Sequence, residues 1–84
     1  MKSSNYTFRV IIEPDEPSGY HGFVPLLKGL HTQGETLKEV KENVREAIIC
    51  HLQGLLKDNE QIPIEGDSFE SIETISREEI NASV

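Results

Sequence analysis

The chain has 84 residues and a mass of 9.5 kDa, which allows one small domain and excludes most enzyme architectures. Eight lysines and arginines stand against 15 aspartates and glutamates, so the formal net charge is −7. Such a chain repels a phosphate backbone, which argues against a nucleic-acid binder and favours a basic protein partner, although the same charge also simply keeps a small domain in solution.

The first 34 residues predict a three-stranded antiparallel meander, because short runs of alternating apolar and polar residues are separated by turn-forming residues. Two prolines, two acids, a serine and a glycine make up residues 14–19, a composition typical of a hairpin turn. Lys28 and Gly29 supply the second turn. The expected strands are residues 6–13, 20–24 and 30–33.

A long amphipathic helix is predicted after the meander. Thr36 is its expected N-cap, because Glu39 follows three residues later and completes the capping-box pattern. Asp58 and Asn59, followed by Pro63, mark its expected end. The apolar residues recur at steps of three and four and form one stripe: Leu37, Val40, Val44, Ala47, Ile48, Leu52, Leu55 and Leu56.

The C-terminal residues carry most of the acidic excess. Residues 65–84 contain one basic residue against six acidic ones, which is a net charge of −5. Residues 69–75 alternate and predict a fourth strand, although both of its faces are mixed. Ser76 resembles a helix N-cap, but too few residues follow it for a stable helix. We therefore expect one domain over residues 1–76 and an acidic tail over residues 77–84.

The expected fold is of the α+β class, in the order β-β-β-α-β, with a small antiparallel sheet and one long helix on one face of it. One helix cannot cover both faces of a sheet, so the other face is expected to meet a second copy or another partner. The exposed sheet face and the acidic C-terminal part, residues 65–84, are the expected interaction surface. Its candidate residues are Ile11, Phe23, Glu70 and Glu73.

No group of residues predicts a catalytic, cofactor or metal site. Glu13, Asp15 and Glu16 cluster at the first turn, where an acid/base pair or a magnesium site is the alternative to a merely solvated turn. A meander followed by a helix also resembles the start of a ribonuclease-H-type fold, whose chemistry needs carboxylates that converge on two metals. The acids of the helix mostly lie off its apolar stripe, which argues against a nuclease.

The histidines and the cysteine do not form a site either. His21 and His31 fall on neighbouring strands, where a cross-strand pair could bind a cation, but no third ligand has a fixed spacing to them. Cys50 and His51 are adjacent on the helix and point about 100° apart, which excludes a hydrogen-bonded pair. A single cysteine, no apolar signal segment and no membrane-length apolar run indicate a cytoplasmic protein.

Residues 8–63 contain a series of motifs in a fixed order: Glu13-Pro14-Asp15, Gly19-Tyr20, Val24-Pro25, Gly29, Thr32–Glu39, Asn43–Ile48 and Ile62-Pro63. With these motifs in this order, the chain resembles the HicB-like antitoxin family. Three positions depart from the usual family pattern, because Lys28, Leu30 and Val40 stand where proline, cysteine and alanine are usual.

The resemblance implies a partial ribonuclease-H-like fold without the nuclease site. It also implies a non-catalytic antitoxin that masks a small basic ribonuclease toxin of the HicA type, as a homo-oligomer such as a dimer or tetramer. Many family members add a DNA-binding module, but the residues after Pro63 are too few and too acidic for one, so direct DNA binding is not expected. The alternatives are an orphan homo-oligomer that binds another protein or a small ligand, and a vestigial metal-dependent nuclease.

Overall fold

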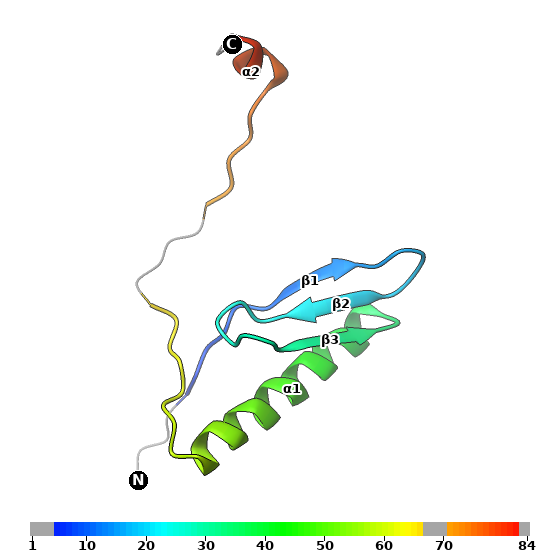
Figure 1. Cartoon of the computed structure of the whole chain (residues 1–84). Helices are drawn as coiled ribbons and strands as arrows, with labels where there is room; N and C mark the ends of the chain where they lie inside the picture. The colour runs from blue at the N-terminus through cyan, green and yellow to red at the C-terminus, as the bar shows by residue number, and fades with distance from the viewer. Residues whose placement is uncertain (1–4, 67–70, 83–84) are drawn as a thin grey trace.

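The computed structural model describes residues 5–66 and 71–82. It confirms the α+β class, with three antiparallel strands followed by one long helix that covers one face of the sheet (Figure 1). Among the described residues, neither helix is long and apolar enough to cross a membrane. The elements are β1 (Ile11–Pro14), β2 (Tyr20–Phe23), β3 (His31–Gly34), α1 (Leu37–Lys57) and α2 (Arg77–Ala82).

The sheet is a meander in the order β1-β2-β3, in which both neighbouring pairs are antiparallel. The first hairpin loop contains Gly19 with a φ of +86°, a conformation that favours glycine, and the Asp15 N–H donates to the Gly19 carbonyl at 2.9 Å. The loop between β2 and β3 contains Gly29 with a φ of +83°. Both predicted turns are therefore confirmed at their glycines.

The boundaries of α1 follow the predicted signals. Thr36 is the N-cap, and its Oγ1 accepts a hydrogen bond from the Glu39 N–H at 3.0 Å. The helix ends at Lys57 with Asp58 as its C-cap, and Asn59 takes a left-handed φ of 58°. Two buried residues of its apolar stripe, Val40 and Val44, face the sheet.

The core depends on the loop between β2 and β3 as much as on the helix. Val24, Leu27 and Leu30 are buried there, and together with Val40 and Val44 they form the core cluster. The Leu27 N–H donates to the Val24 carbonyl, and the Leu30 N–H donates to the Leu27 carbonyl. Two successive turns thus bring every third residue of this loop under the sheet.

The first strand is shorter than predicted. Residues 6–10 were expected to be strand, but pairing begins at Ile11, opposite Phe23. Further pairing would require β2 to continue past Phe23, and the chain instead turns at Val24, whose carbonyl accepts from Leu27. β2 therefore offers no pairing partner for residues 6–10.

The C-terminal part also differs from the prediction. The expected fourth strand over residues 69–75 is not formed at residues 71–75, and residues 69 and 70 lie outside the described part. Residues 77–82, expected to be a tail, form α2. Ser76 and Glu79 explain this helix, because the Ser76 N–H donates to the Glu79 carboxylate at 2.9 Å and the Glu79 N–H donates to Ser76 Oγ at 3.2 Å.

Candidate interaction surface

The face of the sheet that lies away from α1 is made of alternate strand residues. Gly22 faces the helix, because a Cβ added to it would lie 2.7 Å from Cγ2 of Val44. Successive strand residues point to opposite faces, so His21 and Phe23 point away from α1. Their register partners point the same way. We call these residues the helix-free face: Ile11, Phe23 and His31 in one row, and Glu13, His21 and Gln33 in the next.

Stacked rings form the centre of the helix-free face. The ring centroids of Phe23 and His31 lie 5.7 Å apart with an interplanar angle of 26°, and those of His21 and Phe23 lie 6.3 Å apart at 15°. Ile11 lies opposite Phe23 and is 36% exposed. The centre of this face is therefore aromatic and apolar, and no element of the described chain covers it (Figure 1).

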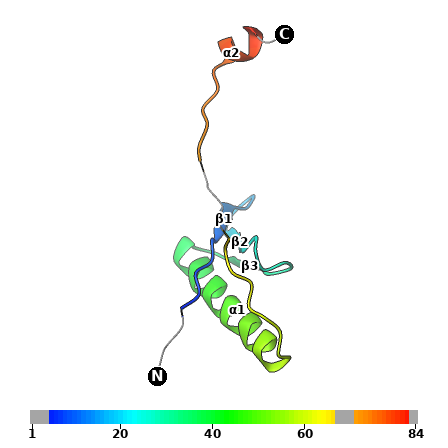
Figure 2. The same cartoon turned by 90° about the vertical axis from the view of Figure 1, so that its left-hand side faces the viewer.

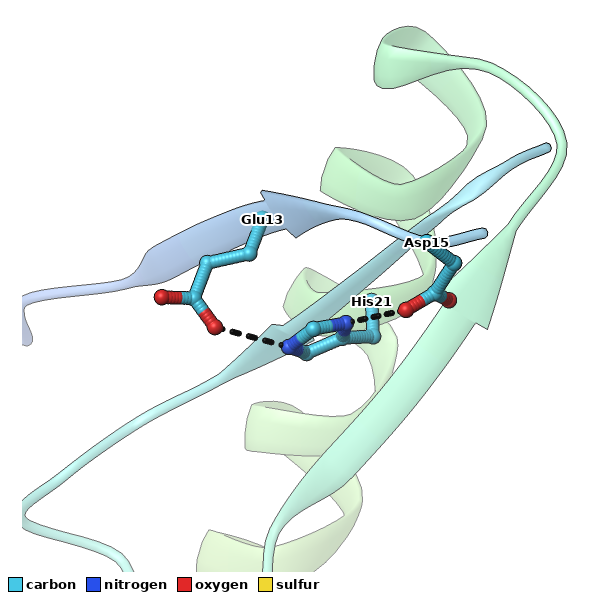
Figure 3. Close-up of polar contacts among 3 residues, drawn as sticks. All are labelled: Glu13, Asp15 and His21. Carbon is cyan, nitrogen blue, oxygen red and sulfur yellow. Dashed lines mark hydrogen bonds and ion pairs between the residues drawn. The ribbon is translucent and has the colours of Figure 1, made fainter. Parts of the chain in front are cut away.

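Two carboxylates hold His21 at the edge of this centre (Figure 3). Glu13 reaches it from the opposite position on β1, and Asp15 reaches it from the hairpin loop. Oδ1 of Asp15 lies 2.5 Å from Nδ1 of His21, and Oε1 of Glu13 lies 2.9 Å from Nε2. The imidazole therefore bridges the strand and the loop.

This geometry selects the protonated form of His21. A neutral imidazole has one N–H, whereas the imidazolium has two and can donate to both carboxylates at once. The hydrogen bond with Asp15 and, second, the one with Glu13 raise the pKa of His21 above its ordinary value of 6.5. His21 on the helix-free face therefore stays protonated to a higher pH than an ordinary histidine does.

The bridge makes a prediction for pH dependence. Because the pKa of His21 is raised in the folded chain, the bridge stabilises the fold fully below pH 6.5, and this contribution is lost as the pH rises through the raised pKa. We expect the ring protons of His21 to titrate in NMR spectra with a midpoint above 6.5. Asp15→Asn should move that midpoint back toward 6.5. A wild-type midpoint at or below 6.5 would contradict the charged bridge.

The predicted interaction residues fall in two places. Ile11 and Phe23 are register partners on the helix-free face. Glu73 is exposed in the extended segment before α2, and Glu70 lies outside the described residues. The sequence did not indicate the role of His21. A cation-binding pair with His31 on the neighbouring strand was only an alternative, and His21 lies opposite Gln33 in the register. The register of the hairpins, with Glu13 opposite His21, is the signal that could have indicated the bridge.

The described residues contain no group of three histidine, cysteine or acidic side chains placed to hold a metal ion. Glu13 and Asp15 approach opposite nitrogens of one imidazole and so do not converge on a common point (Figure 3). Cys50 is exposed on α1. The helix-free face therefore has an aromatic centre with acidic residues beside it.

The sequence is similar to those of known proteins over most of its length. The family model described as HicB-like antitoxin of bacterial toxin-antitoxin system matches residues 8–83. A UPF0150 protein of Synechocystis is 38% identical over 71% of this chain and 76% of its own length, and one of Thermoplasma acidophilum is 46% identical over 67% and 81%. Antitoxin HicB 1 of Photorhabdus laumondii is 36% identical over 74% of this chain and 40% of its own length. No solved structure matches.

Proposed function

The chain belongs to the HicB-like antitoxin family of bacterial toxin-antitoxin systems, and on this premise we propose that it neutralises a small basic ribonuclease toxin by covering the toxin's surface. The observation that carries the proposal is the helix-free face. Protein interfaces usually have a centre enriched in aromatic side chains and a polar, charged rim around it. Phe23, stacked between two imidazoles, is the expected anchor.

Charge supports the choice of a basic partner. A ribonuclease of this kind must attract RNA, so its RNA-binding surface is positive. The chain has a net charge of −7, Glu13 belongs to the helix-free face, and Asp15 contacts His21 on that face. Opposite charges speed the encounter of two proteins and suppress wrong partners. We therefore expect these acidic residues to contact the same positive surface with which the toxin would bind RNA.

The proposal includes a non-catalytic role and no direct contact with DNA. The order of strands and helix supports a partial ribonuclease-H-like fold, and the two carboxylates nearest the sheet are bound to His21 instead of facing a shared metal position. The net charge of −5 over residues 65–84 disfavours a phosphate backbone. The chain would act in the cytoplasm as a homo-oligomer with one toxin-binding face per copy.

Co-expression with the product of the adjacent reading frame tests the proposal. If that neighbour is a small basic protein, the two should elute together from a sizing column. Phe23→Ala should weaken the complex by about 30-fold, because loss of an interface anchor removes about 2 kcal/mol. Leu56→Ala is the matched control, since Leu56 is 61% exposed near the end of α1, away from the helix-free face. Equal affinity of wild type and Phe23→Ala would overturn the assigned surface.

A further inference from the structure

We propose that the C-terminal segment of one copy, residues 71–82, docks into an apolar groove on a second copy. The inference rests on the homo-oligomer included in the proposed function, and it assigns the surfaces that form it. The groove and the helix-free face are different parts of the molecule. Self-association through the groove therefore leaves the toxin-binding face open.

The groove lies between the N-terminal residues 5–12 and α1 and has a volume of about 800 Å³. Its walls are mainly apolar, and two of its side chains, Val10 and Ile49, are 39% and 46% exposed. Lys41 and Arg45 also line it. An open apolar groove lined partly by two cations fits an apolar segment that carries acids.

Residues 71–82 have these properties. Ile72, Ile75 and Ile80 are 94%, 60% and 52% exposed. Ile75 and Ile80 stand at the N′ and N4 positions around the Ser76 cap, the two positions that meet in a hydrophobic staple. A hydrophobic staple at these positions would present the two isoleucines together at the start of α2.

α2 is too short to be stable by its own hydrogen bonds. An isolated helix of six residues is unstable in water, and helices of this length persist when an apolar side packs on another surface. In both views the segment leads away from the sheet and α1, with α2 at its far end (Figures 1 and 2). The isoleucines of α2 and of the residues before it therefore need a surface from elsewhere.

Charge identifies that surface as the groove. Glu73 and Glu78 flank the isoleucines along the segment, and Lys41 and Arg45 line the groove. The route of the chain favours a second copy over the same one. Before the segment begins, Glu65 accepts a hydrogen bond from the Arg9 N–H at 3.2 Å, beside the residues that form one wall of the groove. Residues 71–82 lie away from the sheet and α1 in both views, so two copies can exchange these segments around a twofold axis.

A disulfide crosslink in the full chain tests the exchange. In a Cys50→Ser background, Ile49→Cys places a thiol in the groove and Ile75→Cys places one on the segment. Under mild oxidation we expect a covalent dimer on a non-reducing gel. A control that pairs Ile75→Cys with Lys28→Cys, an exposed position outside the groove, should crosslink at least tenfold more slowly. Equal rates for the two pairs would overturn the assignment of the groove.

Isotope labelling separates the second copy from the same copy. Light and ¹⁵N-labelled chains are mixed in equal amounts before oxidation, and the masses of the crosslinked peptide pairs are measured by mass spectrometry. Exchange predicts that about half of the pairs contain one light and one heavy peptide. Pairs of uniform label, with a crosslinked monomer on the gel, would show docking within one chain and overturn the proposal. The measurement needs no toxin, so its failure and the failure of the proposed function are distinguishable.

Charge reversal gives a second measurement that leaves the core unchanged. Lys41→Glu with Arg45→Glu should raise the dissociation constant of the homodimer about tenfold in analytical ultracentrifugation, as expected for the loss of two exposed ion pairs. Adding Glu73→Lys and Glu78→Lys to this variant should return the dissociation constant to the wild-type value. A dissociation constant that does not respond to the first pair, or that the second pair fails to restore, would contradict the assigned contact.

Discussion

Gly34→Ala is expected to destabilise the domain by about 3 kcal/mol, the upper part of the range for overpacking a tight contact. A Cβ at Gly34 would lie 2.6 Å from the backbone nitrogen of Val40 and 3.0 Å from its Cα. These are backbone atoms, so the start of α1 would have to move as a unit. Val40 is fully buried, and such a shift would disturb the core as well as the contact between β3 and α1.

Gly54→Ala is the matched control for this substitution. Gly54 lies inside α1, and a Cβ there would meet nothing within 4 Å. Alanine is the better helix former, so Gly54→Ala should stabilise the domain by up to about 1 kcal/mol. Urea unfolding followed by circular dichroism measures both variants. A free energy of unfolding for Gly34→Ala within about 0.5 kcal/mol of wild type would show that β3 and α1 are not packed as described.

Leu27→Ala is expected to lower the free energy of unfolding by about 2–5 kcal/mol, because it removes a buried side chain and leaves a cavity. Leu27 is 1% exposed and lies in the loop between β2 and β3, in the core cluster with Val24 and Leu30. The same urea titration measures this loss. Leu56→Ala removes the same atoms from an exposed position and should change stability by less than about 0.5 kcal/mol. Equal effects of the two variants would contradict the core.

Local signals in the sequence predicted the elements that depend on local chemistry. The capping box at Thr36 and the stop at Asp58 placed both ends of α1, because a helix end is satisfied by residues within one turn of it. The glycines of the two turns were predicted for the same reason. The placement of Ile11 and Phe23 on the same face was predicted from the two-residue period of strands, and the register adds that they lie opposite each other.

Features that depend on distant contacts were missed. The burial of Leu27 results from two turns folding under the sheet, and alternation of polarity along the chain does not report it. The His21 bridge requires the register that brings Glu13 opposite it and the loop that returns Asp15. The fourth strand was predicted from alternation alone. Alternation describes a side-chain pattern and supplies no partner strand, and residues 71–75 have no strand pairing in the described chain.

The proposed function requires that the helix-free face inactivates a basic ribonuclease by covering it. The most direct measurement is RNA cleavage by the small basic protein of the adjacent reading frame, titrated with the purified chain. Cleavage should fall to background at about one chain per toxin molecule, and Phe23→Ala should need a large excess for the same inhibition. Undiminished cleavage at a saturating concentration of the folded wild-type chain would contradict the claim.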